Sequence, residues 1–216
     1  MESNDERGTM TRDSAEGARP YHHGDLRAAL VQEAMHLLAA EGLAGFSVAK
    51  LARALGVSSA SPYRHFPDRE SLLAAVAARI ADELTERLRA AADRAGADPA
   101  ARLAAAIGAY TRYVIEHRVG LDIVFLDGLQ QAKYVDLHEH TRRLTDLQLD
   151  LAVDACAGAA YDDVFDLVDQ VLALAHGYAA LHNFGAYAQE RRSAEEIERK
   201  AVAAARRLID GQRSAG

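Results

Sequence analysis

Residues 46–73, with the sequence FSVAKLARALGVSSASPYRHFPDRESLL, constrain the fold more than any other part of the chain. Ser47 can accept a hydrogen bond from a free backbone N–H at the start of a helix, and the apolar residues after it share one helical face. Gly56 favours the left-handed conformation in which many helices end. Two helices joined by a short glycine-containing turn form a helix-turn-helix, whose second helix can enter the DNA major groove. The segment therefore predicts a DNA-binding domain.

Pro62 makes the expected second helix, the recognition helix, unusual. A proline is tolerated only in the first turn of a helix, and it biases the preceding residue, Ser61, away from helical torsions. Either the helix begins near Ser59, so that Pro62 lies in its first turn, or the helix is shorter than usual. Both alternatives leave few long side chains to read bases.

The remaining sequence predicts an all-α protein. Apolar residues recur at helical spacing, and no segment alternates with the period of a strand. Besides the helix-turn-helix, the expected helical segments are 25–41, 68–95, 99–117, 119–129, 134–156, 162–185 and 194–209. We expect about nine helices, arranged as an N-terminal three-helix domain and a C-terminal helical bundle.

Composition and charge divide the chain into three parts. Residues 1–18 are polar, carry a net charge of −3 and are expected to form a disordered leader. Residues 19–67 form the expected helix-turn-helix domain, and residues 68–216 the expected ligand-binding and dimerisation domain. The net charge of −7 arises mostly outside residues 19–70, which carry +1. Phosphate contacts must therefore come from a few placed groups and backbone N–H donors.

Several features favour a cytoplasmic protein that does not interact with a membrane. Half of the 216 residues are hydrophobic, which is ample for a buried core, yet the apolar runs are short. None approaches the roughly 18 continuous apolar residues of a membrane span, and the N-terminus lacks the apolar core of a secretory signal. Cys156 is the only cysteine, so the chain can form no internal disulfide.

The run LARALGVSSASPYRHFPDRESLL resembles the tetracycline-repressor (TetR) family of transcriptional regulators. The resemblance covers residues 22–75 and lies in the Leu-Gly-Val turn, the Tyr-x-His-Phe run at residues 63–66 and the following Pro67. In the second half, EHRVGLDIVFLDG and LALAHGYAALHNFG are similar to the WHG-type C-terminal domain of one branch of this family. The resemblance implies an all-α homodimer with a four-helix interface, a double-stranded DNA operator as partner, and a small-molecule pocket between the C-terminal helices.

The resemblance also implies roles for individual residues in DNA binding. Tyr63, His65 and Ser47 would contact phosphate, and Arg69 stands where the family usually has a phosphate-contacting lysine. The residues before Pro62 would face the bases. The full set of candidate DNA contacts is Ser47, Ser58, Ser59, Ala60, Ser61, Tyr63, Arg64, His65 and Arg69. The alternative for Tyr63 is a place in the core, as for most aromatic residues at helical spacing.

Helix facing suggests a ligand pocket in the C-terminal bundle. Ligand pockets are mostly apolar with a few placed polar groups. The candidate lining residues, which would supply both, are Tyr110, Tyr113, Phe125, His138, His176 and Tyr178. For His176 the alternative is a buried, hydrogen-bonded histidine.

A possible metal site is the run of His138, Glu139 and His140, since histidine and glutamate side chains can bind metal ions. Residues two apart on a helix point in nearly opposite directions, so the two imidazoles cannot share one ion. The spacing also differs from the H-E-x-x-H of helical zinc sites. We therefore expect no metal and no cofactor, and the sequence contains no recognisable catalytic constellation.

Together these features predict a homodimeric transcriptional regulator, a repressor that binds a palindromic operator and is released by a small-molecule effector. Two alternatives belong to other classes. One is a helical interaction module that does not bind DNA, and the other is a helical-bundle enzyme.

Overall fold

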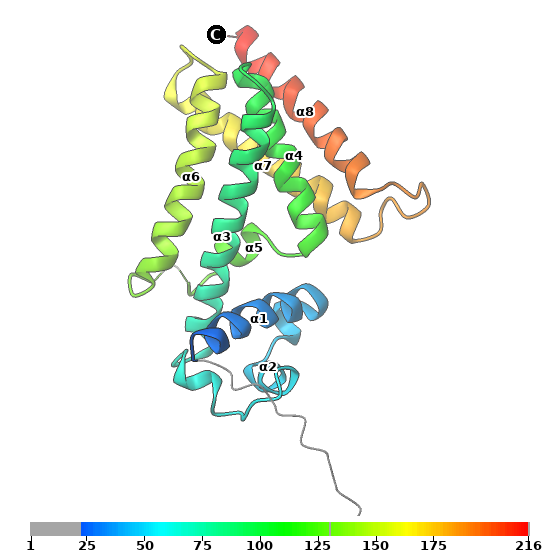
Figure 1. The fold of residues 1–216 in the computed structure, drawn as a ribbon. Coiled ribbons are helices and arrows are strands. Elements are labelled where there is room, and N and C mark those ends of the chain that lie inside the picture. Colours follow the sequence, from blue (N-terminus) through cyan, green and yellow to red (C-terminus); the bar gives the residue numbers. More distant parts are fainter. Residues whose placement is uncertain (1–22, 130, 216) are drawn as a thin grey trace, which may run out of the picture.

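The computed structural model describes residues 23–129 and 131–215, which form eight α-helices and one short 3₁₀-helix (Figure 1). The helices are α1 (His23–Gly45), α2 (Val48–Ala54), the 3₁₀-helix η1 (Pro62–Arg64), α3 (Arg69–Arg94), α4 (Pro99–His117), α5 (Leu121–Val124), α6 (Val135–Ala155), α7 (Tyr161–Asn183) and α8 (Ala194–Ala215). The described residues contain no strand, and the predicted all-α fold is confirmed. The expected leader, residues 1–18, lies outside the described residues.

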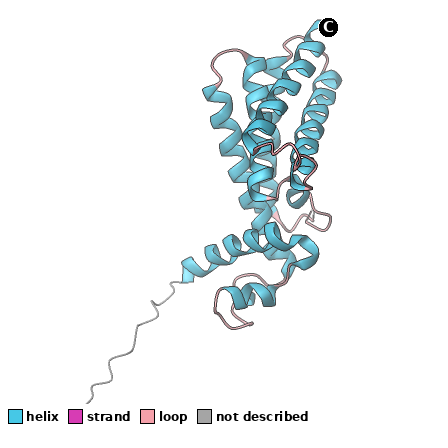
Figure 2. Ribbon diagram, turned by 90° about the vertical axis from the view of Figure 1, so that its right-hand side faces the viewer, coloured by secondary structure: helices cyan, strands magenta, loops and turns pink. Residues whose placement is uncertain are grey.

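The molecule has a small domain below a larger helical bundle (Figures 1 and 2). The small domain consists of α1, α2 and η1, while α4, α6, α7 and α8 form most of the bundle. Helix α3 belongs to both, because it packs against α1 at one end and against α4 and α6 further along. Its 26 residues span about 39 Å at 1.5 Å per residue. The predicted helical connection between the two domains is therefore present.

Helix α3 begins at a strong N-terminal cap. One carboxylate oxygen of Asp68 accepts hydrogen bonds from the Ser71 backbone N–H at 2.6 Å and from the Ser71 hydroxyl at 2.5 Å. These bonds hold the pKa of the Asp68 carboxyl below its ordinary value. The predicted apolar stripe of α3 is buried, and its members are Leu72, Leu73, Val76, Ile80, Leu84 and Leu88. The cap and the stripe together fix where α3 starts and which face it buries.

Helix α1 extends beyond the expected end at Gly42, as far as Gly45. Gly42 nevertheless has φ of 68°, outside the helical range, so the regular helix is interrupted at the predicted residue. A side chain at this φ would be strained.

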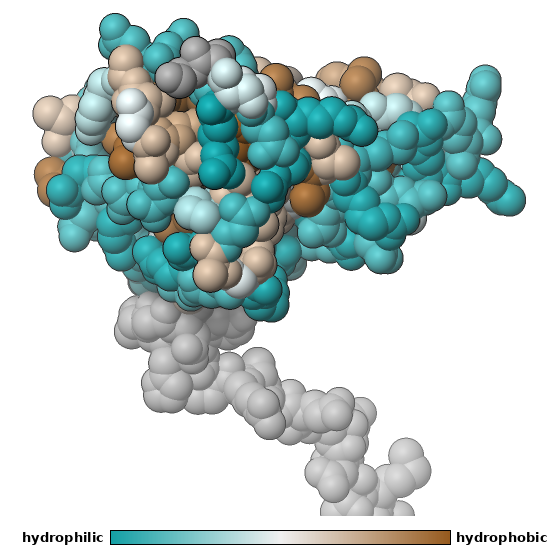
Figure 3. All heavy atoms as spheres, turned by 90° about the horizontal axis from the view of Figure 1, so that it is seen from above, coloured by the Kyte–Doolittle hydropathy of each residue, from teal (hydrophilic) through white to brown (hydrophobic). Residues whose placement is uncertain are grey.

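A close contact between α4 and α8 organises the bundle core. A Cβ atom at Gly108 would lie only 2.4 Å from Val202 Cγ2, so the glycine allows α8 to approach α4. Helix α8 buries a narrow stripe of Ile197, Ala201, Ala205 and Ile209. Figure 3, a view from above the bundle, shows hydrophobic residues in brown set among hydrophilic residues in teal.

Helix α7 is only partly covered within one chain. Its buried stripe consists of Val164, Leu167, Val171, Ala175 and Ala179. Among the described residues, α7 is the single helix whose length and composition would suffice for a membrane crossing, and 28% of its apolar stretch is buried. The sequence predicted a helix buried against two partners, and the chain itself covers one side.

Candidate nucleic-acid interface

Helix α2, the first helix of the helix-turn-helix, has both of its predicted end signals. At its start, the Ser47 hydroxyl accepts a hydrogen bond from the Lys50 backbone N–H at 3.2 Å. At its end, Gly56 has φ of 66°, and the N–H groups of Gly56 and Val57 donate to carbonyls of the last turn at 3.1 and 3.0 Å. This pair of bonds is a Schellman motif, which turns the chain sharply towards the next element.

The segment after this turn, residues 58–65, is here called the recognition segment. It contains no α-helix, only the three-residue 3₁₀-helix η1. The N–H groups of Ser61, Arg64 and His65 each donate to the carbonyl three residues back, at 2.9, 3.2 and 3.0 Å. Pro62 accepts through its carbonyl but has no N–H, so it cannot donate a hydrogen bond in this ladder. Of the two alternatives for Pro62, the shortened helix is therefore the one observed.

Ser61 differs from the expectation for a residue before proline. Its torsions, φ −63° and ψ −43°, are right-handed helical. The backbone hydrogen bonds on either side of Ser61 favour this conformation, and its hydroxyl lies 2.8 Å from the Ser58 hydroxyl. These local bonds outweigh the steric bias that proline imposes.

The recognition segment is held by apolar residues and exposes polar ones. Pro62 and Phe66 are buried, whereas Tyr63 is 53% exposed, so the alternative that placed Tyr63 in the core is wrong. The other exposed candidates are Ser58, Ser59, Ala60 and Arg64, and the half-buried ones are Ser47, Ser61, His65 and Arg69. All except Ser47 and Arg69 belong to this one segment.

Arg69 also has a structural role. Its guanidinium donates to the Leu43 carbonyl at 3.2 Å and lies 5.5 Å from the centre of the Phe46 ring. Lys50 similarly donates to the Gly45 carbonyl at 3.1 Å and pairs with Glu41. Both side chains therefore stabilise the connection between α1 and α2 through their contacts with residues 43–46.

Arg53 is a basic group that the sequence-based list omits. It lies exposed in the last turn of α2, close in sequence to the recognition segment. Among the described residues, neither Arg53 nor exposed Arg64 forms an ion pair. The available signal for Arg53 was its position off the apolar face of α2.

The six candidate ligand residues differ in their partners and exposure. The Tyr110 hydroxyl and His176 Nδ1 are hydrogen-bonded at 3.0 Å, which brings α4 and α7 together. The Tyr113 hydroxyl donates to Glu83 on α3 at 2.9 Å. Both tyrosines are completely buried, and burial raises the pKa of each phenol.

The other three candidates lie in other surroundings. His138, in the first turn of α6, is hydrogen-bonded through Nε2 to the carbonyl of Gln131, which precedes this helix, at 3.0 Å. Phe125 is 49% exposed after α5, and Tyr178 is partly buried against the core. The pair of Tyr110 and His176 is thus the one polar contact that links two of the six candidates within the described residues.

The histidines of α6 have separate partners, consistent with their spacing. His140 Nδ1 lies 2.5 Å from Asp82 Oδ1 on α3, while His138 is bonded to the Gln131 carbonyl. Within the described part of the chain, no group of three or more His, Cys, Asp or Glu side chains could hold a metal ion.

The small domain matches a known family, and the whole chain matches solved structures. The model for bacterial regulatory proteins of the tetR family matches residues 30–76. A protein of unknown function from Rhodococcus sp. RHA1 is 30% identical, with a TM-score of 0.71 over 90% of this chain and 98% of its own. A tetR-family transcriptional regulator from Streptomyces coelicolor is 22% identical, with a TM-score of 0.66 over 90% of this chain and 85% of its own.

A third structure, RolR in complex with the ligand resorcinol, is 18% identical, with a TM-score of 0.56 over 88% of this chain and 92% of its own. A search of curated proteins found no match. The helix-turn-helix geometry, the family match and the shared fold lead to one assignment: the chain belongs to the TetR family of DNA-binding transcriptional regulators.

Proposed function

We propose that the chain is a homodimeric repressor that binds a palindromic operator and is released by a small-molecule effector. The observation that carries this proposal is the uncovered side of α7, which favours a second subunit. A dimer with two-fold symmetry presents two recognition segments, and these require two inverted half-sites.

The uncovered α7 face lies on the C-terminal half of the helix and at its C-terminal cap: Ala173, Leu181 and the cap residue Phe184 are exposed, and Leu174, Gly177 and Ala180 are half-buried between them. Leu181 is 47% exposed and Phe184 85% exposed. A Cβ atom placed on Gly177 would meet no other atom within 4 Å, so this face is open. Exposed apolar area is unfavourable by about 25 cal/mol per Å², and covering it with the same face of a second copy removes it from water on both subunits.

We assign the DNA contacts to Ser47, Ser58, Ser59, Ala60, Ser61, Tyr63, Arg64, His65 and Arg69. Tyr63, His65 and Ser47 serve as phosphate contacts, and exposed Arg64 lies beside them in the sequence. The short side chains before Pro62 allow specificity through serine hydroxyls, contact between Ala60 and a thymine methyl group, and DNA shape. Operator mutagenesis that traces one dominant guanine dependence to Arg64 would contradict this assignment.

We place the effector beside the hydrogen-bonded pair of Tyr110 and His176, with Tyr113, Phe125, His138 and Tyr178 as further candidates. Resorcinol in the RolR structure supports a small molecule as the class of effector. Since Tyr110 is fully buried, entry requires local movement of α4 or α7. An effector acts only through its different affinity for two states, and α3 connects the bundle to the small domain.

The test measures fluorescence anisotropy of the DNA upstream of its own gene with the full chain. We expect binding that weakens as salt concentration rises and release of the DNA by a member of a phenol library. Nuclease footprinting of the same DNA should show protection of an inverted repeat whose half-sites lie about one helical turn apart or a multiple of it. His176→Phe should abolish release without weakening operator binding. Binding of an asymmetric single site contradicts the dimeric mode, and release that survives His176→Phe contradicts the effector site.

A further inference from the structure

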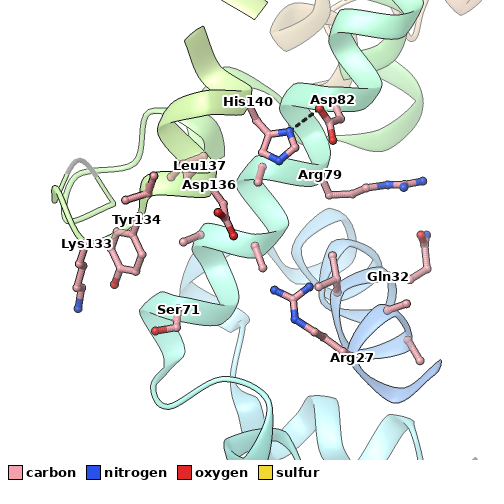
Figure 4. Close-up of a pocket in the computed structure, with 17 residues that line it drawn as sticks. Arg27, Gln32, Ser71, Arg79, Asp82, Lys133, Tyr134, Asp136, Leu137 and His140 are labelled. Atoms are coloured by element: carbon pink, nitrogen blue, oxygen red, sulfur yellow. Dashed lines mark hydrogen bonds and ion pairs between the residues drawn. The ribbon is translucent and has the colours of Figure 1, made fainter. Parts of the chain in front are cut away.

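A cleft of about 710 Å³ lies where the two domains meet, between α1, α3 and α6 (Figure 4). We call it the junction cleft. Helices α1 and α6 both pack on α3 while hardly touching each other. Three small side chains of α3, those of Ala74, Ala75 and Ala78, form its floor. The volume lies within the range of about 300–1,000 Å³ that is usual for small-molecule sites.

Most charged groups around the junction cleft already have partners. Arg79 pairs with Glu83 at 2.7 Å, Asp82 pairs with His140 at 2.5 Å, and Lys133 lies 3.9 Å from Asp68. These pairs leave little charge from α3 and the α5–α6 connection for a ligand.

Two charged side chains on opposite walls of the junction cleft have no ion-pair partner among the described residues. Arg27 reaches from α1 and Asp136 from α6 towards the same stretch of α3 (Figure 4). Neither forms an ion pair within the described residues; the Arg27 guanidinium lies 5.1 Å from the centre of the Phe66 ring. The Tyr134 hydroxyl, on a side chain that is 8% exposed, is buried in the same lining without a hydrogen-bond partner. The cleft therefore combines an apolar floor with one cationic wall, one anionic wall and one unsatisfied hydroxyl.

We propose that the junction cleft binds a small zwitterionic organic molecule whose carboxylate and amine are separated by an apolar chain. Arg27 binds the carboxylate in the two-pronged geometry that guanidinium groups favour, and Asp136 accepts hydrogen bonds from the ammonium. The apolar chain covers the alanine floor. Such a ligand joins α1 to α6 directly. This site is separate from the effector site placed beside Tyr110 and His176, and operator binding does not require it.

The first test measures the melting temperature and the heat of binding of the full chain without DNA. The probes are the unbranched ω-amino acids from 4-aminobutanoate to 8-aminooctanoate, each compared with the alkanoate and the alkylamine of equal length. A specific ligand must raise the melting temperature. We expect one length to bind at least about tenfold more tightly than both of its single-charge analogues, because both walls then gain a partner. No binding in the series, or equal binding of the analogues, would overturn the proposal.

The second test locates the site with variants. Arg27→Gln and Asp136→Asn should each weaken binding of the best probe at least about tenfold, and Ala75→Leu should block it by filling the floor. Matched controls outside the cleft, Arg53→Gln and Asp150→Asn, should leave binding unchanged. Asp136→Asn is the decisive variant, because Arg27 also contacts Phe66 and its loss can disturb folding. Full binding by Asp136→Asn would overturn the assignment, whatever the outcome for operator binding.

Discussion

The recognition segment and the uncovered α7 face are both short of partners, but their chemistry is opposite. The recognition segment exposes hydroxyl groups, one phenol and one guanidinium, all of which water can solvate. The α7 face exposes alanine, glycine, leucine and phenylalanine, whose hydration is unfavourable. A polar surface is stable in water both with and without its partner. An apolar surface of this kind becomes more stable when another surface covers it. Under the proposed function, this difference corresponds to a transient partner, the operator, at residues 58–65 and a lasting one, the second subunit, at α7.

The largest effect is expected from a charge placed on the α7 face. Leu181→Glu would bury an unpaired carboxylate between two subunits, which costs several kcal/mol. We expect the dimer dissociation constant to rise by at least about 100-fold, measured by sedimentation equilibrium. The matched control, Ala97→Glu, adds the same charge in the exposed α3–α4 loop and should leave the dimer intact. If Leu181→Glu dimerises as the natural chain does, another surface forms the interface.

A smaller effect is expected from Tyr63, which tests whether the recognition segment is a polar DNA contact. Tyr63→Phe removes a single exposed hydroxyl and keeps the ring. Loss of one hydrogen bond corresponds to about 0.5–1.5 kcal/mol, or about 2- to 12-fold in affinity. Because a phosphate contact carries no sequence information, affinity for the operator and for random duplex should fall by the same factor. Anisotropy titrations with both duplexes check this, and unchanged affinity for both would remove Tyr63 from the interface.

Short-range signals in the sequence predicted the small domain better than the bundle. The Ser47 cap and the Gly56 stop each depend on residues within five positions, and both are present. The contact of His140 with Asp82 and that of Tyr110 with His176 join residues 58 and 66 positions apart. Periodicity shows which face of a helix is apolar, but it does not show which neighbour that face meets.

The candidate DNA contacts lie close together in the structure, whereas the candidate ligand residues do not all have common partners. This difference also follows from the range of the contacts involved. The recognition segment is one continuous stretch, so a match to its sequence places nearly all candidates together. The ligand candidates come from four separate parts of the bundle, and their meeting depends on helix packing. The junction cleft was not predicted, because Arg27 and Asp136 are 109 positions apart and each looks like an ordinary surface charge.

The cap of α3 lies just after the recognition segment, at the start of the helix that packs against both α1 and the bundle. Asp68→Ala removes two hydrogen bonds from Ser71, and loss of an N-cap costs about 0.5–2 kcal/mol. The pKa of the Asp68 carboxyl is lowered in the folded state, so its contribution is present above the ordinary value of 3.8 and is lost as pH falls through the folded pKa. Urea unfolding at pH 7 and pH 3.5 should show the difference between natural chain and variant shrinking at the lower pH. Ser71→Ala, which removes only the hydroxyl bond, should give part of the effect at pH 7.

The smallest effect is expected at Pro62, which leaves the recognition segment without one backbone N–H donor. Pro62→Ala restores a backbone N–H that can donate to the Ser58 carbonyl, so the recognition segment can continue as α-helix rather than η1. Proline also restricts the unfolded chain, and its loss there costs about 0.4–1 kcal/mol of stability. We therefore expect a slightly less stable protein whose Arg64 and His65 amides exchange more slowly with solvent, measured by hydrogen exchange. If these amides exchange as in the natural chain, the Ser58–Ser61 hydroxyl contact and the buried packing of residue 62, rather than the missing N–H, keep the segment short.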